Sequence, residues 1–285
     1  MRILIFGASG FLGLHLVNFL KKKKVELITC GRNSSNSIKI KNYDKKYLSN
    51  LIIKKKPKVI INLVALTDVD LCEQKPLLAK KVNTDIIKSI SEIIKKNKLN
   101  IKLIHISTDQ VYSGNGRKPE NKTILLNEYS KSKFNGEKYV LKINGSIIRT
   151  NFFGISKTNK NFVDWIIKSN IKKKKKNVFT NIFFSPIYVK SLCRYIYLFC
   201  KRNIPGIFNV GSNNCISKSE FAFYLIKKLK LNEKYLIKKK YTKKMLLANR
   251  PKNMCMNSKK FEDKFSINTK NCYREIDSMI KEIKK

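Results

Sequence analysis

Acidic residues and histidines are scarce in this chain of 285 residues. It has 19 Asp and Glu against 62 Lys and Arg, which gives a formal net charge of +43, and its two histidines are His15 and His105. These two histidines do not have the spacing of metal ligands, and the cysteines form no CxxC pair. We therefore expect no metal site in this protein.

Long apolar runs are also missing. No uninterrupted hydrophobic stretch is long enough to cross a bilayer, and the N-terminal MRILIFGASG lacks the apolar region of a signal peptide. The seven cysteines are odd in number, so we expect reduced thiols. Together these features predict a cytoplasmic protein with no membrane span.

The excess of positive charge has two interpretations. A basic protein can bind nucleic acid or an anionic membrane, but lysine, isoleucine and asparagine are abundant throughout this chain, as an AT-rich genome produces. The lysines lie in short scattered runs without interleaved aromatics, such as Lys21–Lys24, Lys54–Lys56 and Lys172–Lys176. We predict no specific nucleic-acid partner, although the positive field would attract an anionic substrate such as a nucleotide sugar.

The order of apolar segments predicts an α/β fold with a doubly wound parallel sheet. Short apolar runs alternate with helical patterns over the first half of the chain. We expect the nucleotide-binding domain over residues 1–155, with its sheet completed by about 178–210, and a smaller α/β substrate lobe over 156–285, interleaved with it. The expected strands are Arg2–Phe6, Val25–Cys30, Val59–Val64, Ile101–Ile106, Gly145–Arg149 and Ile207–Val210. The expected helices are Tyr47–Lys55, Ala79–Lys96, Tyr129–Leu141, Asn161–Ser169, Pro186–Cys200, Ser217–Leu229 and Cys272–Ile283.

A glycine-rich turn follows the first expected strand. Gly7, Gly10 and Gly13 form G-x-x-G-x-x-G between that strand and a helix, the context in which glycines cradle a dinucleotide pyrophosphate. The second expected strand ends without the acidic residue that binds the ribose hydroxyls of NAD. Arg32 follows it and can pair with a 2′-phosphate. The sequence therefore favours NADPH as the cofactor.

The candidate catalytic residues are Thr108, Tyr129 and Lys133. Tyr129 and Lys133 are four residues apart, so they share one face of a helix. A nearby ammonium lowers the pKa of a phenol, which makes the phenol a usable acid or base. YxxxK is frequent by chance in a lysine-rich chain, but Thr108 lies at the end of the fourth strand, where doubly wound folds bind ligands.

Several stretches resemble the extended short-chain dehydrogenase/reductases, and most closely the dTDP-4-dehydrorhamnose reductase family, which has a Rossmann-type fold. The resemblance spans nearly the whole chain. The stretches that carry it are GASGFLG, NLVALTDVDLCE, Val82-Asn83, STDQVYSG, YSKSKFNGE, IIRT, Asn209-Val210-Gly211 and Arg250-Pro251.

The resemblance assigns roles to named positions. It makes Thr108, Tyr129 and Lys133 catalytic. The family positions that bind the cofactor match Gly10, Phe11, Leu12, Leu63, Val64 and Ala65. The family positions that border the sugar match Asp109, Arg149 and Asn151. The implied reaction is NADPH-dependent reduction of the 4-keto group of a nucleotide-linked 6-deoxy-sugar for surface polysaccharide synthesis, and a homodimer is one possible assembly. The alternatives are a related epimerase or dehydratase, and a non-catalytic subunit that resembles methionine adenosyltransferase β.

Overall fold

A computed structural model describes residues 1–31, 38–40, 42–156 and 161–283. Within these residues the chain forms two compact units. The first comprises Met1–Thr108, Asn127–Arg149 and Cys193–Phe208, and the second comprises Asp109–Leu126, Thr150–Leu192 and Asn209–Lys285. The expected boundary near residue 155 remains a prediction.

A seven-stranded sheet forms the centre of the first unit. Its strand order is β11-β6-β5-β4-β1-β2-β3, and the pairs β1–β2, β1–β4, β2–β3 and β4–β5 are parallel. The expected doubly wound fold is confirmed. The strands are β1 (Arg2–Phe6), β2 (Glu26–Gly31), β3 (Ile38–Lys39), β4 (Val59–Asn62), β5 (Lys102–Thr108), β6 (Ser146–Thr150) and β11 (Gly206–Asn209).

The strand order has a functional consequence. The chain moves outward from β1 in one direction through β2 and β3, and in the other through β4 and β5. A crevice forms where the direction reverses, outside the carboxyl ends of β1 and β4, and doubly wound sheets bind their ligands there. The glycine loop follows β1, so the fold places it at this crevice.

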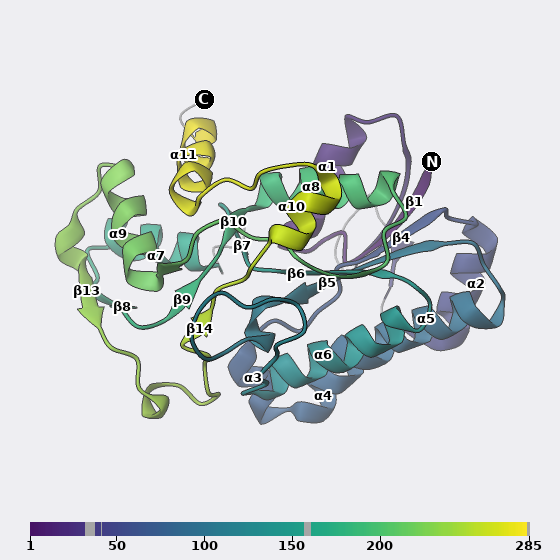
Figure 1. The fold of residues 1–285 in the computed structure, drawn as a ribbon, viewed down its shortest axis with the longest axis horizontal. Helices are drawn as coiled ribbons and strands as arrows, with labels where there is room; N and C mark the ends of the chain where they lie inside the picture. The colour runs from purple at the N-terminus through teal and green to yellow at the C-terminus, as the bar shows by residue number, and fades with distance from the viewer. Residues whose placement is uncertain (32–37, 41, 157–160, 284–285) are drawn as a thin grey trace. The chain divides into compact units, whose positions relative to one another are not determined.

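Helices cover both faces of this sheet, with α2, α5 and α6 on one side and α1 on the other (Figure 1). In α5, Ile86, Ile90 and Ile94 recur along one buried face, because residues three and four apart meet on a helix. They pack with Leu4, Leu48 and Val140 in one apolar core. The helices of this region are α1 (Phe11–Lys21), α2 (Lys45–Lys55), α3 (Val69–Gln74), α4 (Pro76–Lys80), α5 (Ile86–Lys96), α6 (Glu128–Leu141) and α8 (Val189–Lys201).

Two expected helices differ from the structure. The stretch Ala79–Lys96 is divided, because a π-helical turn, η1 (Lys81–Asp85), separates α4 from α5. The stretch that begins at Pro186 is first a strand, β10 (Ile187–Tyr188), which pairs with β7 (Phe152–Phe153) before α8 begins. Apolar runs of this length do not distinguish a strand from a helix by periodicity alone.

The second unit contains helices and three small sheets. These sheets are β10-β7, β12-β9-β14 and β13-β8. Its other elements are η2 (Asp109–Val111), α7 (Phe162–Ile171), β8 (Lys176–Phe179), β9 (Phe183–Phe184), β12 (Ile216–Ser217), α9 (Lys218–Lys228), η3 (Glu233–Tyr235), β13 (Leu236–Lys239), η4 (Lys243–Met245), β14 (Asn253–Met254), α10 (Lys259–Phe265) and α11 (Cys272–Ile283).

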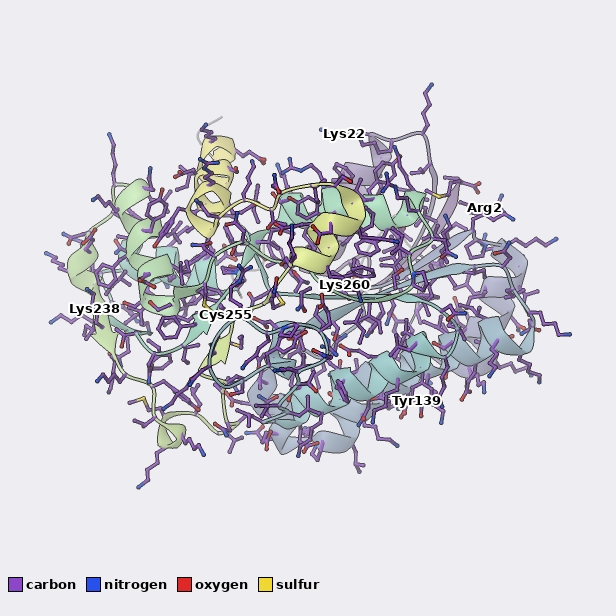
Figure 2. The ribbon with its side chains drawn as sticks, in the orientation of Figure 1. Arg2, Lys22, Tyr139, Lys238, Cys255 and Lys260 are labelled. Atoms are coloured by element: carbon purple, nitrogen blue, oxygen red, sulfur yellow. A yellow bond between two sulfur atoms is a disulfide. The ribbon has the colours of Figure 1, made fainter. Side chains whose placement is uncertain are left out.

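Two cysteines of the second unit depart from the expectation of reduced thiols. Cys215 and Cys255 form a disulfide, with Cα atoms 5.5 Å apart (Figure 2). Forty residues separate the two in sequence, so the spacing gave no local signal for the bond. The expectation was wrong for this pair, whereas Cys30, Cys72, Cys193, Cys200 and Cys272 are buried reduced thiols.

Within the described residues, no helix is long and apolar enough to span a membrane.

Candidate active site

The glycine loop is held between the ends of two strands. Gly7 has φ of +84°, and a Cβ there would lie 3.0 Å from the backbone of Leu63 and Val64. The N–H groups of Gly7 and Ala8 both donate to the carbonyl of Cys30, at 3.0 and 2.9 Å. Only glycine adopts this conformation without strain, so the loop can pass close to the segment after β4.

Gly13 allows helix α1 to approach the loop. A Cβ on Gly13 would lie 2.3 Å from the Gly7 carbonyl oxygen and 2.6 Å from that of Ala8. Helix α1 begins at Phe11, with Leu12 buried and with no side chain that caps its first turn. The N–H groups of that turn are suited to bind the phosphates of a dinucleotide.

Replacing Gly13 with Ala should therefore disrupt the loop. We expect the free energy of unfolding to fall by about 1–3 kcal/mol, since the methyl group forces the backbone apart, and NADPH binding to weaken. Gly116→Ala is the control: nothing lies within 4 Å of its added Cβ, so its cost of about 1 kcal/mol comes only from the strain of alanine at positive φ, and NADPH binding should be unchanged. Urea denaturation and NADPH fluorescence titration would check both variants. Equal effects of the two changes would contradict the close-approach argument.

A cavity of about 930 Å³ opens beside this loop, entirely within the first unit. Its size lies within the usual range for ligand pockets. Three of the residues expected along the cofactor, Leu63, Val64 and Ala65, line it together with Gly7 and Gly10. The loop has no room for a Cβ at Gly7 or Gly13, and it lies beside a cavity of this volume. Both features fit a dinucleotide.

Asn83 fixes the segment along this cavity. It lies in the π-helical turn η1, and its Oδ1 accepts from the N–H of Leu66 at 2.8 Å. Its Nδ2 donates to the Leu66 carbonyl at 3.1 Å and to Ser132 Oγ at 3.0 Å. Single π-turns are often found at functional sites. Here Asn83 of the turn connects Leu66, beside the cavity, with Ser132 of helix α6.

The end of β2 carries no carboxylate. The strand ends at Gly31, where an added Cβ would lie 2.7 Å from Ser9 Oγ. Arg32, the expected partner of a 2′-phosphate, lies outside the described residues, so its role remains a prediction.

Helix α6 carries Tyr129 and Lys133 on one buried face. A capping box starts the helix: Asn127 Oδ1 accepts from Ser130 N at 2.8 Å, and Ser130 Oγ accepts from Asn127 N at 3.3 Å. This cap fixes the first turn and so the position of Tyr129. Tyr129 is 8% exposed, Lys133 is 2% exposed, and Thr108, at the end of β5, is 4% exposed. All three lie in the first unit.

The ammonium group of Lys133 is held by strand β5. Its Nζ donates to the carbonyl of Ile106 at 2.7 Å and lies 3.3 Å from His105 Nε2. Burial lowers the pKa of Lys133 to about 8, and the carboxylate of Glu137 opposes this shift. Lys133 can therefore change its protonation state at mildly alkaline pH.

A second buried network lies one turn along α6. Glu137 Oε1 accepts from Ser107 Oγ at 2.5 Å and from Arg149 Nε at 2.9 Å, and its Oε2 accepts from Arg149 Nη2 at 2.6 Å. Arg149 and Glu137 are each 1% exposed. The bidentate Glu137–Arg149 pair therefore anchors Ser107, the residue before Thr108, through the Ser107–Glu137 hydrogen bond. The expected contact of Arg149 with the sugar remains a prediction, and the structure gives the guanidinium this internal partner.

Replacing Glu137 with Gln should destabilise the protein by about 3–5 kcal/mol, because the change leaves the buried guanidinium of Arg149 without its counter-charge. The matched control is Asp263→Asn, which breaks an exposed ion pair with Lys259 and should cost less than about 1 kcal/mol. Urea denaturation at neutral pH measures both. A small loss for both variants would show that the Glu137–Arg149 pair does not stabilise the fold.

Two of the predicted sugar residues form a pair in the second unit. Asn151 Nδ2 donates to Asp109 Oδ2 at 2.8 Å. Lys218, which the sequence analysis did not identify, belongs to the same unit, and its Nζ lies 3.4 Å from the ring centroid of Phe184. Burial lowers the pKa of Lys218 to about 8, and Asp109 opposes that shift. The contact of Asp109 and Asn151 with the sugar remains a prediction.

Three further buried polar residues near the site, His105, Asn62 and Glu137, were not predicted from the sequence. A signal existed for Glu137, because it follows Lys133 by four residues and so continues the buried face of α6. His105 was considered only as a metal ligand. Asn62 and His105 are hydrogen-bonded although 43 residues apart, through the parallel pairing of β4 and β5.

Comparison with known proteins agrees with this geometry. The profile of the family described as "RmlD substrate binding domain" matches residues 1–285. The spore coat polysaccharide biosynthesis protein SpsK of Bacillus subtilis is 30% identical over 227 residues, which cover 78% of this chain and 77% of SpsK.

Solved structures share the whole fold. A hypothetical dTDP-4-dehydrorhamnose reductase from Sulfolobus tokodaii is 31% identical, with a TM-score of 0.86 over 97% of this chain and 98% of that one. The dTDP-4-dehydrorhamnose reductase of Bacillus anthracis, solved in complex with NADP, is 22% identical, with a TM-score of 0.89 over 99% of each chain.

Proposed function

The chain belongs to the RmlD substrate-binding domain family, and from this premise we propose that it is an NADPH-dependent reductase of a 4-keto nucleotide sugar. The observation that carries the proposal is the presence of Thr108, Tyr129 and Lys133 in the unit that also holds the dinucleotide cavity. The relatives named as dTDP-4-dehydrorhamnose reductases favour a dTDP-linked 6-deoxy-sugar.

The cofactor is NADP(H), which supplies a hydride to the keto carbon when bound. The residues that would hold it are the glycine loop of Gly7, Gly10 and Gly13, the first turn of α1 from Phe11 and Leu12, and the segment Leu63–Ala65. Arg32 is proposed for the 2′-phosphate. The absence of an acidic side chain at the end of β2 supports NADP over NAD.

The chemistry assigned to this chain is proton transfer to the carbonyl oxygen. Tyr129 donates its phenolic proton as the keto carbon is reduced, so the phenol O–H bond breaks and the alcohol O–H bond forms. The hydroxyl of Thr108 hydrogen-bonds the same oxygen. The charge of Lys133 stabilises the phenolate that remains.

We also propose a sugar site, a pathway, a cellular location and an oligomeric state for the protein. Asp109 and Asn151 are proposed to border the sugar. The name of the relative SpsK supports a role in polysaccharide synthesis. A cytoplasmic location and a homodimer are also proposals.

The test follows NADPH absorbance with a panel of 4-keto nucleotide sugars that includes dTDP-4-dehydrorhamnose. We expect turnover of at least one dTDP-linked sugar, with NADPH preferred over NADH. Cofactor binding without turnover of any keto sugar would overturn the reductase proposal and favour a non-catalytic binding subunit. Interconversion of sugars without net loss of NADPH would favour an epimerase.

A further inference from the structure

His105 connects the sheet to Lys133, and its hydrogen bonds determine which ring nitrogen carries the proton. Asn62 Nδ2 lies 3.0 Å from His105 Nδ1. The orientation of the Asn62 amide is fixed from its other side, because Oδ1 accepts from the backbone N–H of Val64 at 3.2 Å. The amide nitrogen of Asn62 therefore faces His105 and donates to Nδ1.

A neutral imidazole that accepts at Nδ1 carries its proton on Nε2. His105 is 1% exposed. Burial and the charge of Lys133 hold the pKa of His105 well below its usual value, so the ring is neutral. The Nε2–H group then points at Lys133 Nζ, 3.3 Å away.

This contact is favourable for only one form of Lys133. An ammonium has three N–H donors and no acceptor. It therefore cannot accept a hydrogen bond from the Nε2–H group, and two donors face each other. A neutral amine has a lone pair that can accept from Nε2–H. Among the described residues, the Ile106 carbonyl and His105 Nε2 are the two hydrogen-bonding contacts of Lys133 Nζ.

We propose that His105, held as its Nε2–H tautomer by Asn62, is a positioning residue that disfavours the ammonium form of Lys133 and so sets the pH at which the active site loses its positive charge. Asn62 and His105 act through Lys133 and need not contact the substrate. The role of Lys133 in the reaction rests on the proposed function, whereas the tautomer of His105 does not.

Other ionisable groups also face Lys133 or its surroundings. Tyr129 and Glu137 lie four residues before and after it on α6. The charge of Glu137 favours the ammonium, but Glu137 also pairs with Arg149 of β6, which reduces that effect. From β5, only the neutral His105 ring and the Ile106 carbonyl contact Nζ within the described residues. His105 is thus the group that opposes the ammonium by hydrogen bonding.

The first experiment is ring ¹⁵N NMR of the protein without substrate. The chain has two histidines, so a His15→Gln variant assigns both signals. We expect His105 to be neutral at neutral and alkaline pH, with the proton on Nε2 throughout. A proton on Nδ1 of His105 would overturn the proposal. This readout needs no turnover.

The second experiment compares the pH dependence of kcat/KM for wild type, His105→Gln and Asn62→Asp, with dTDP-4-dehydrorhamnose and NADPH. The amide oxygen introduced by His105→Gln can accept from the ammonium. The carboxylate introduced by Asn62→Asp can accept from Nδ1–H of His105 and so reverse the tautomer. Both changes should move the alkaline limb upward by about one pH unit, and His15→Gln should not.

The outcomes separate this inference from the proposed function. A loss of stability with an unmoved limb would show a merely structural role for His105 and Asn62 and overturn the inference. Absence of turnover in wild type would overturn the proposed function, while the NMR result still decides the tautomer.

Discussion

Tyr129→Phe should lower kcat by about 10²–10⁴-fold and leave NADPH binding unchanged. The substitution removes one hydroxyl group and keeps the ring, so helix α6 and its capping box should persist. A positioned general acid contributes a rate factor of this size, and Tyr129 is the residue proposed to protonate the carbonyl oxygen. Stopped-flow or steady-state NADPH absorbance measures the rate, and fluorescence titration measures the cofactor affinity.

The same helix provides a matched control. Tyr139 lies ten residues further along α6, at its outer face (Figure 2), where its ring contacts the lysines Lys88 and Lys142. Tyr139→Phe removes the same atom from the same helix, so it should leave both kcat and cofactor binding unchanged. If Tyr129→Phe reduced a keto sugar at the wild-type rate, Tyr129 would not be the proton donor.

The sequence could predict the features that depend on local pattern. Gly7, Gly10 and Gly13 lie between an apolar strand and a helix, and this order is enough to predict a glycine loop. The structure has this loop, with close backbone contacts at Gly7 and Gly13. Tyr129 and Lys133 are likewise placed by helical periodicity. The sheet followed from the alternation of buried strands and amphipathic helices, because each element has to bury one apolar face.

The features that the sequence did not reveal depend on contacts between distant segments. Ser107 and Glu137 are 30 residues apart, and Asn62 and His105 are 43 apart. The first pair joins strand β5 to helix α6, and the second joins the neighbouring strands β4 and β5. Neither contact is encoded in the periodicity of a single element. A lone histidine in a strand is usually interpreted as a ligand or a packing residue, and its tautomer depends on partners that are known only in three dimensions.

Lys133→Met should lower kcat by about 10²-fold or more and also change how stability depends on pH. The loss of rate follows because no positive charge then stabilises the phenolate of Tyr129. Methionine is apolar and of similar length, so the helix face remains filled. The Ile106 carbonyl, which accepts from Lys133 Nζ, loses its donor, and this loss adds a cost of about 1–3 kcal/mol that does not depend on pH.

The pH dependence gives the change an independent readout. The pKa of Lys133 is lowered by burial to about 8 in the folded protein, against about 10.4 in an unfolded chain. Between these values the unfolded state binds more protons, so the free energy of unfolding rises with pH across this window. Below about pH 8 both states are protonated and the penalty is constant. Lys133→Met should therefore flatten the rise between about pH 8 and 10.4.

Lys138→Met is the control for this measurement, because Lys138 lies on the exposed face of α6. Urea denaturation at a series of pH values should give a parallel profile for wild type and Lys138→Met and a flatter one for Lys133→Met. Lys218, whose pKa is also lowered to about 8, contributes to the rise in all three proteins and cancels in the differences. If the Lys133→Met profile ran parallel to that of wild type, the buried ammonium would not be the source of the pH dependence, and a low rate would then have to come from altered packing at Tyr129.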